Sequence, residues 1–193
     1  MYKFGRFVCW VICGCFVRLK VSGRQNIPKR GGFILASNHL SYLDPVVLGI
    51  ACPRDLNFMA KEELFRNPFF GWVLRNVGAF PVKRKSADTS ALKEAIKRVS
   101  SGKGLVLFPE GGRGNGAELD PAEAGIGFIA AKAAAPVIPA LIKGTEQILS
   151  KQSKKIKSAD IRILFGKQIS VGQNMPYQDA ADLIMENIRH LSG

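Results

Sequence analysis

Residues 32–51 read GFILASNHLSYLDPVVLGIA, and this stretch decides the fold. The apolar run 32–37 predicts a buried strand, and the apolar run 45–51 predicts a short helix soon after it. Asp44 followed by Pro45 is typical of a helix start, with aspartate at the N-cap and proline at the first helical position. A strand that leads through a short loop into a helix is the repeating unit of α/β domains.

Apolar and amphipathic segments alternate along the rest of the chain. Residues 89–101 form the clearest helix, because Leu92, Ile96 and Val99 make one apolar stripe and Gly102 ends it. Further strands are predicted at 55–60, 78–82, 104–108, 136–142 and 161–165, and further helices at 121–135 and 179–191. This alternation predicts one α/β domain, residues 21–193, with a mostly parallel central sheet flanked by helices.

His39 and Asp44 belong to the loop between the first predicted strand and helix. Histidine is the commonest general base in enzymes, and an aspartate that accepts from its other ring nitrogen fixes the required tautomer. The two residues are therefore candidates for a base and its orienting partner. The alternative is structural, with Asp44 serving only as a helix cap and His39 only as a polar loop residue.

A glycine-rich loop follows the strand predicted at 104–108. It reads FPEGGRGNG over residues 108–116 and carries one carboxylate, Glu110, and one guanidinium, Arg113. Glycines such as Gly111 let backbone N–H groups approach an anion closely, and an arginine can bind a phosphate through two parallel hydrogen bonds. The pattern favours an anion site, and the alternative is a flexible surface turn.

Lys61 and Arg84 each follow a predicted strand. Open α/β sheets bind their ligands at the carboxyl ends of the strands, so these basic residues are expected at the same edge as Arg113. Together they predict a phosphate pocket beside the His39 loop. Basic residues on exposed loops are otherwise solvated, which is the alternative.

The overall charge also points to an anionic partner. The chain has 193 residues, and 28 basic minus 15 acidic residues give a net charge of +13. Such a balance favours nucleic acid, an anionic membrane surface or an anionic substrate. The cysteines show no ligand-type spacing with the histidines, so neither a metal site nor a disulfide framework is predicted, and reduced thiols indicate a cytoplasmic setting.

Residues 7–17 form an uninterrupted apolar run with basic residues on both sides. A spanning helix needs about 20 apolar residues, so this run is too short, and no small-residue cleavage site of a signal peptide follows it. Residues 1–20 are therefore predicted to form a membrane-interfacial segment, with Trp10 entering the acyl boundary. A buried core helix is the alternative. The aromatic stretch 64–74 either joins the core or enters lipid.

These motifs, taken in chain order, resemble those of the PlsC-like 1-acyl-sn-glycerol-3-phosphate acyltransferase (lysophosphatidic acid acyltransferase) family. The matching blocks are His39–Asp44, Met59–Leu64, Gly78–Arg84, Phe108–Arg113 and Ala135–Pro139. In the family, the block that corresponds to Phe108–Arg113 and the residue after it usually contains Glu-Gly-Thr-Arg-Ser. In this chain Gly112 and Gly114 replace both hydroxyl residues. This departure leaves the acceptor open.

The resemblance implies an enzyme that moves a fatty acyl chain from acyl-acyl carrier protein or acyl-coenzyme A to the sn-2 hydroxyl of 1-acylglycerol 3-phosphate, giving phosphatidic acid. It implies that His39 is the general base and Asp44 its partner. It also implies that the substrate is bound by Lys61, Arg84, Glu110, Gly111 and Arg113. No metal or cofactor beyond the acyl thioester is expected, and the protein is expected at the cytoplasmic face of an anionic membrane.

Two other functions are compatible with parts of the sequence. An acyltransferase of the same fold could use glycerol 3-phosphate or a lyso-aminolipid as acceptor. A basic nucleic-acid-binding module would explain the charge, but the aromatic residues fall within apolar runs and do not alternate with basic residues as stacking motifs require. No nucleic-acid partner is therefore predicted.

Overall fold

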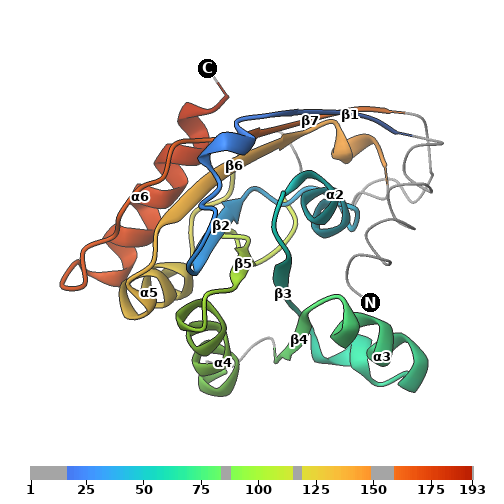
Figure 1. Ribbon diagram of the computed structural model, residues 1–193, viewed down its shortest axis with the longest axis horizontal. Coiled ribbons are helices and arrows are strands. Elements are labelled where there is room, and N and C mark those ends of the chain that lie inside the picture. Colours follow the sequence, from blue (N-terminus) through green and yellow to red (C-terminus); the bar gives the residue numbers. More distant parts are fainter. Residues whose placement is uncertain (1–16, 84–87, 115–118, 149–158, 193) are drawn as a thin grey trace.

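The protein forms a seven-stranded sheet in a computed structural model that describes residues 17–83, 88–114, 119–148 and 159–192 (Figure 1). The strand order is β1-β7-β6-β2-β5-β3-β4. Neighbouring strands run parallel except for the antiparallel pair β6 and β7. The strands are β1 (Val17–Ser22), β2 (Phe33–Ser37), β3 (Leu56–Lys61), β4 (Ala79–Val82), β5 (Gly104–Leu107), β6 (Val137–Lys143) and β7 (Ala159–Phe165).

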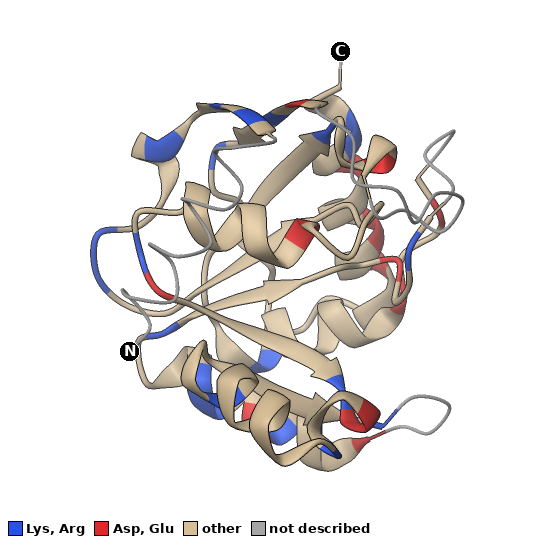
Figure 2. Ribbon diagram, turned by 90° about the vertical axis from the view of Figure 1, so that its right-hand side faces the viewer, with Lys and Arg blue, Asp and Glu red and all other residues tan. Residues whose placement is uncertain are grey.

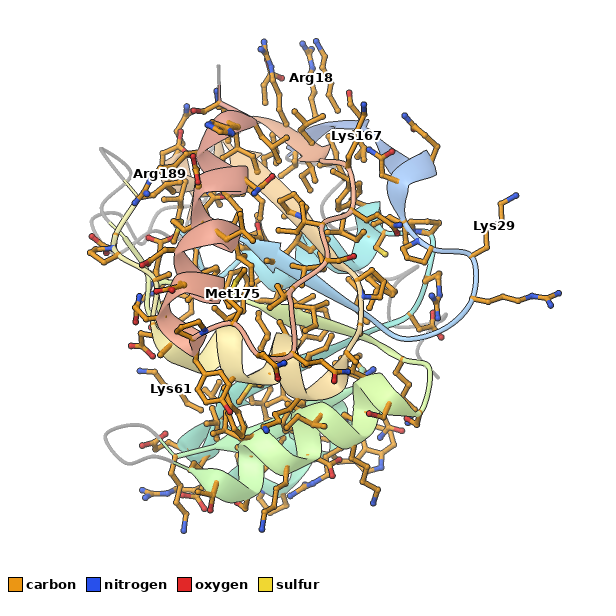
Figure 3. All side chains as sticks on the ribbon, turned by 90° about the vertical axis from the view of Figure 1, so that its left-hand side faces the viewer. Arg18, Lys29, Lys61, Lys167, Met175 and Arg189 are labelled. Atoms are coloured by element: carbon orange, nitrogen blue, oxygen red, sulfur yellow. The ribbon has the colours of Figure 1, made fainter. Side chains whose placement is uncertain are left out.

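Helices cover both faces of this sheet (Figure 1). They are α2 (Asp44–Ala51), α3 (Pro68–Asn76), α4 (Thr89–Ser100), α5 (Ala124–Ala133) and α6 (Tyr177–His190), with short 3₁₀ turns η1 (Arg24–Asn26), η2 (Glu62–Phe65) and η3 (Thr145–Gln147). Helices α4, α5 and α6 lie on one face, which Figure 3 shows from the front, and α2 lies on the other. The predicted α/β class with a mostly parallel sheet is confirmed.

The central strand β2 shows why both faces are covered. All five of its residues are buried, so side chains that alternate between the two faces are apolar on each. Ile34 and Ala36 pack into the core beneath α4, α5 and α6. Phe33 and Leu35 pack into the second core, against α2. Each core is a continuous apolar cluster, and the sheet separates them.

Strand β1 was not predicted, and it changes one boundary. Its sequence VRLKVS alternates apolar and polar residues, and its burial alternates in the same way, as expected of an edge strand. It pairs in parallel with β7. Residues 17–20, which the sequence assigned to a membrane-interfacial segment, therefore belong to the sheet. Residues 1–16 of that predicted segment lie outside the described residues.

The other predicted elements are present with small shifts at their ends. The largest shift is at α5, which begins at Ala124, whereas the sequence placed the helix start at Pro121. The backbone N–H of Glu123 instead donates to the carbonyl of Pro109 (2.9 Å), so this segment is tied to the glycine-rich loop. Within the described residues, no helix combines the length and apolar content needed to cross a membrane.

Candidate active site

The parallel strands bring the predicted site residues to one edge of the sheet. Strands β2, β5, β3 and β4 are consecutive neighbours, so their carboxyl ends meet at the same edge. His39 follows β2, Glu110 follows β5 and Lys61 ends β3. Neighbouring strands lie about 4.8 Å apart. The edge therefore presents an imidazole, a carboxylate and an ammonium in that order.

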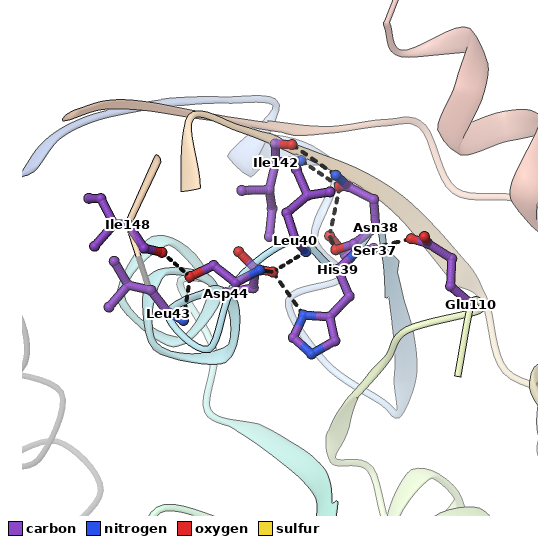
Figure 4. A network of polar contacts seen from close by, with 10 residues as sticks. Ser37, Asn38, His39, Leu40, Leu43, Asp44, Glu110, Ile142 and Ile148 are labelled. Carbon is purple, nitrogen blue, oxygen red and sulfur yellow. Dashed lines mark hydrogen bonds and ion pairs between the residues drawn. The ribbon is translucent and has the colours of Figure 1, made fainter. Parts of the chain in front are cut away.

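Asn38 fixes the start of the His39 loop and was missed in the sequence analysis. Its side chain is buried, and its Nδ2 donates to the carbonyl of Ile142 (2.9 Å) while its Oδ1 accepts from the N–H of Ile142 (2.8 Å) (Figure 4). The amide thus continues the ladder between β2 and β6 by one step. The residue directly after it, His39, is therefore held at a fixed distance from the sheet.

His39 and Asp44 are in direct contact. Nδ1 of His39 lies 2.8 Å from Oδ2 of Asp44, and the Asp44 side chain is completely buried. The same Oδ2 accepts from the backbone N–H groups of Leu40 (2.6 Å) and Ser41 (2.7 Å). With three donors converging on one oxygen, the carboxylate is held rigidly against the imidazole (Figure 4).

The predicted cap role of Asp44 is wrong. The N-cap of α2 is Leu43, no side-chain cap is present, and Asp44 is already the first helical residue. Its carboxylate cannot reach forward to the free N–H groups of the helix because it turns back onto the preceding loop. Asp44 therefore organises the His39 loop, and Pro45 in the first turn starts the helix without that cap.

The imidazole of His39 is held from its other side by the glycine-rich loop. Its ring stacks on Phe108 with 4.0 Å between centroids and 17° between planes. The backbone N–H of His39 donates to Oε1 of Glu110 (3.1 Å), and the carbonyl of His39 accepts from the N–H of Gly114 (2.9 Å). Among the described residues none hydrogen-bonds Nε2 of His39, so that nitrogen is left for a ligand.

Glu110 joins two loops through its carboxylate. Oε1 accepts from the N–H of His39, and Oε2 accepts from the N–H of Asp120 (3.3 Å). Burial raises the pKa of the Glu110 carboxyl above its ordinary value, and the two N–H donors oppose that shift. Both oxygens are thus engaged by backbone groups, and a contact between Glu110 and the substrate stays a prediction.

Arg113 lies over an aromatic ring contributed by the His39 loop. Its guanidinium carbon is 3.6 Å from the ring centroid of Tyr42, a cation–π contact. In the described part of the chain, Nη1 of Arg113 is buried and has no hydrogen-bond partner. A guanidinium that is stacked yet not paired with a carboxylate of the described residues retains its charge for an anion.

Gly111 and Gly112 differ in backbone conformation and in the space available for a side chain. Gly111 has φ +61°, a conformation that favours glycine, and a Cβ there would also displace the exposed carboxylate of Glu123. A Cβ at Gly112 would meet nothing closer than the carbonyl of Glu110 at 4.0 Å. A Cβ therefore fits at position 112, so close packing at the backbone does not require a glycine there.

The structure describes only one of the other two predicted basic residues, and it lies at the end of a strand as predicted. Lys61 is exposed at the end of β3, on the side opposite Lys29 in Figure 3. Arg84 lies outside the described residues. The chain just before it is fixed, because the N–H of Lys83 donates to Oδ2 of Asp88 (2.9 Å). Hydrogen bonds, above all from the Ser90 hydroxyl, lower the pKa of Asp88 to about 2.

The aromatic stretch 64–74 does not join the core. Four of its large apolar side chains are exposed: Leu64, Phe69, Phe70 and Trp72. The sequence also has a cluster of lysines, predicted to add attraction to anionic head groups, that lies outside the described residues: Lys151, Lys154, Lys155 and Lys157.

Known proteins share both the sequence and the fold. The family described as Acyltransferase matches residues 18–143 of this chain. The 1-acyl-sn-glycerol-3-phosphate acyltransferase of Bacillus subtilis is 32% identical over 170 residues, which cover 88% of this chain and 82% of that protein. The chloroplast 1-acyl-sn-glycerol-3-phosphate acyltransferase BAT2 of Brassica napus is 30% identical over 91% of this chain, which spans only 50% of that longer protein.

A solved structure extends the likeness to three dimensions. The 1-acyl-sn-glycerophosphate acyltransferase PlsC of Thermotoga maritima superimposes with a TM-score of 0.78 over 100% of this chain and 78% of its own, at 24% identity. At that identity the superposition bears on the fold alone. The family match spans strands β1 to β6 and therefore includes the whole of the edge where His39, Asp44 and Arg113 lie. The chain belongs to the PlsC-like acyltransferase family.

Proposed function

We propose that the protein transfers a fatty acyl chain from an acyl thioester to the sn-2 hydroxyl of 1-acylglycerol 3-phosphate, producing phosphatidic acid. The relatives named above carry this activity in their names, and residues 18–143 of this chain match the family described as Acyltransferase. The acyl donor is acyl-acyl carrier protein or acyl-coenzyme A, and the thioester is the only co-substrate required.

The observation that carries this proposal is the contact between His39 and Asp44. A glycerol hydroxyl is a poor nucleophile at neutral pH and needs a positioned base. With its Nδ1 proton held by Asp44 at 2.8 Å, His39 presents the unprotonated Nε2 lone pair to the substrate. No serine or cysteine nucleophile is needed, because the substrate hydroxyl takes that role.

The reaction then follows in two steps. The hydroxyl oxygen attacks the thioester carbonyl as its proton passes to Nε2 of His39, and the buried Asp44 carboxylate stabilises the imidazolium that forms. The tetrahedral intermediate collapses, the carbon–sulfur bond breaks, and the leaving thiolate takes the proton back from Nε2. The products are an ester and a free thiol, and His39 is regenerated.

The acceptor's phosphate would be held by basic side chains at the same edge. Arg113 has an unpartnered nitrogen among the described residues, and Lys61 is exposed two strands away from His39. Arg84 completes the proposed phosphate site. The backbone N–H of Gly111 is not free for it, because that group already donates to the carbonyl of Phe108 (3.0 Å). A flexible surface turn, the alternative interpretation, explains this loop less well, because Glu110 and Gly114 are both hydrogen-bonded to the backbone of His39.

We also propose that the enzyme works at the cytoplasmic face of an anionic membrane. The net charge of +13 supports attraction to anionic head groups, and the apolar residues before Val17 supply an interfacial segment. The acceptor and the product are membrane lipids, whereas the thioester donors are carried by a soluble protein or coenzyme. An interfacial position gives access to both.

Purified protein incubated with 1-acylglycerol 3-phosphate and an acyl thioester is expected to release one thiol for each phosphatidic acid formed. Lipid extraction and a thiol reagent measure the two products separately. Glycerol 3-phosphate and a lyso-aminolipid are tested in parallel, because Gly112 and Gly114 replace the hydroxyl residues usual at those positions. If the enzyme used one of these acceptors and not 1-acylglycerol 3-phosphate, the proposed acceptor would be wrong, and the proposed acyl transfer with His39 as the base would stand.

A further inference from the structure

Helix α3 carries an exposed apolar surface that the proposed chemistry does not use. The α3 surface consists of Leu64, Phe69, Phe70 and Trp72, whose exposed fractions are 42%, 75%, 46% and 52%. These are four of the six large hydrophobic residues that are exposed in the described part of the chain. Phe69 and Trp72 stack on each other with 6.4 Å between ring centroids. Leu64 precedes the helix in η2, and the other three residues fall within four positions of α3. Exposed apolar residues grouped in this way mark a binding site more often than scattered residues do.

An amphipathic helix on a protein surface ordinarily turns its large apolar side chains toward the core, whereas α3 exposes them. Gly71 is its only buried residue, and a Cβ there would lie 2.9 Å from the carbonyl of Phe65, so the smallest side chain faces the protein. Phe69 lies about 160° around the helix from Gly71. Phe69 therefore points away from the domain, and Phe70 and Trp72 lie on its two flanks, about 100° from Gly71. All three are exposed, so burial in this domain does not explain them.

Local interactions maintain α3 without that burial. The side chain of Asn67 caps the helix by accepting from the N–H of Phe70 (2.9 Å), and Pro68 occupies the first turn. The guanidinium of Arg75 lies 5.3 Å from the ring centroid of Phe65 and ties the end of the helix to η2. The helix is thus formed and anchored while its aromatic face stays free.

We propose that the α3 surface docks the enzyme on an anionic lipid bilayer. Phenylalanine and tryptophan are suited to the boundary between head groups and acyl chains. Three exposed basic residues, Lys61, Arg66 and Arg75, lie in the same segment of the chain, together with the two acids Glu62 and Glu63. The whole chain carries a net charge of +13. This charge is complementary to anionic head groups. The choice of a lipid occupant rests on the proposed function, in which acceptor and product are membrane lipids.

The position of α3 in the fold agrees with this role. The chain enters η2 and α3 directly from the carboxyl end of β3, at the edge where the active site lies. Helix α3 then leads to β4, the last strand of the sheet, so it lies at the periphery (Figure 1). Figure 2, which views the molecule from the α3 side, shows the helix at the front of the lower part. A bilayer can reach it there without displacing another described element.

Vesicle binding tests the docking surface independently of turnover. The double variant Phe69→Ser/Trp72→Ser is expected to bind phosphatidylglycerol vesicles at least about tenfold more weakly than the unmodified protein in a sedimentation assay. Turnover with acceptor presented in vesicles should fall by a similar factor, whereas turnover of a short-chain, water-soluble acceptor should be retained. Tyr177→Ser removes an exposed aromatic residue from α6 and is the matched control, with full vesicle binding expected.

Tryptophan fluorescence supplies a direct probe of the surface. The chain has two tryptophans, so Trp10→Phe leaves Trp72 alone, and brominated lipids should quench its emission. Unchanged vesicle binding by the double variant, or absence of quenching, would overturn the proposal. A double variant of lower oligomeric mass in solution would assign the surface to a second copy of the chain instead. If no acceptor is turned over while vesicles still bind, the proposed function fails and the docking surface does not.

A second inference concerns Tyr42, which takes no part in the proposed proton transfer or acyl transfer. Its side chain is 63% exposed, yet its ring carries the guanidinium of Arg113 at 3.6 Å. The turn that holds Tyr42 is fixed on both sides, because the hydroxyl of Ser41 donates to the carbonyl of Ile148 and the N–H of Asp44 donates to the carbonyl of Ser41. The ring is thus a rigid platform that comes from the same loop as His39.

We infer that Tyr42 positions Arg113 for the phosphate of the acceptor, an inference that rests on the proposed function. Side-chain freedom is a large cost of using arginine as a ligand, and stacking on a fixed ring reduces it. The ring contacts the guanidinium through its π face and takes up none of the N–H donors, of which Nη1 has no partner among the described residues, so they are left for the phosphate oxygens. Tyr42 is a positioning residue and acts through Arg113.

Steady-state kinetics of ring variants test this role. Tyr42→Leu should raise the KM for 1-acylglycerol 3-phosphate by about three- to thirtyfold, with the KM for the thioester and kcat little changed. Tyr42→Phe keeps the aromatic ring, so its KM for this acceptor should equal that of the unmodified enzyme. Equal loss in Tyr42→Phe and Tyr42→Leu, or an unchanged KM in Tyr42→Leu, would contradict the inference. Failure of the unmodified enzyme to use this acceptor would instead contradict the proposed function.

Discussion

Replacement of His39 by alanine should lower kcat by about 10²–10⁴-fold, because a positioned general base contributes roughly that factor. The substitution removes the imidazole and leaves the backbone contacts of residue 39 intact. These are the N–H bond to Glu110 and the carbonyl bond from Gly114, which hold the two loops together. The fold and vesicle binding should therefore be unchanged, so the loss should appear in turnover alone.

The second histidine of the chain supplies a matched control for this experiment. His190 is the last residue of α6, its side chain is 73% exposed, and its Nε2 lies 3.8 Å from Oε1 of Glu186. His190→Ala should leave kcat and KM unchanged within error. Thiol release and phosphatidic acid formation are measured for both variants at saturating substrates. Normal turnover in His39→Ala would remove the general-base assignment.

Local patterns in the sequence predicted much of the fold. Strands such as β2 and β5 are short, wholly buried and almost entirely apolar runs, and α4 has a clear helical stripe, so local sequence predicts each of them. The contact between His39 and Asp44 was predictable because both residues belong to one short loop. Strand β1 was missed because its alternating pattern directly follows a long apolar run that suggested a helix.

The contacts that complete the site could not be predicted from spacing. Asn38 pairs with Ile142, which is 104 positions away, and the N–H of His39 bonds to Glu110, which is 71 positions away. Neither pair leaves a local signature, since each exists only because β2 lies between β5 and β6. The same holds for Tyr42, whose partner Arg113 belongs to a loop after another strand. Strand order in the sheet, which sequence periodicity does not give, determines all of these contacts.

Replacement of Asp44 by asparagine should also lower kcat by about 10²–10⁴-fold while the protein stays folded. The carboxylate accepts from Nδ1 of His39 and offsets the positive charge that the ring gains during the reaction. A neutral amide cannot supply that charge. Its oxygen can still accept from the N–H groups of Leu40 and Ser41, so the loop should keep its shape.

Because Asp44 is buried, Asp44→Asn should lower kcat strongly and change the free energy of unfolding only a little. The residue is completely buried, and in the described residues its Oδ1 has no hydrogen-bond partner. A buried, half-satisfied carboxylate contributes little to stability, because its desolvation opposes the bonds that Oδ2 makes. Replacing it with an amide removes a buried charge and should change the free energy of unfolding by no more than about 1–3 kcal/mol.

A neighbouring serine distinguishes loss of charge from loosening of the loop. Ser41→Ala removes the hydroxyl that donates to the carbonyl of Ile148 and accepts from the N–H of Leu43 (3.1 Å). It should destabilise the protein by about 1–3 kcal/mol and reduce kcat only a few fold, because Asp44 keeps all of its contacts. Denaturant unfolding and kcat are measured for both variants. If Ser41→Ala lost as much activity as Asp44→Asn, the role of Asp44 would be to shape the loop and not to support the base.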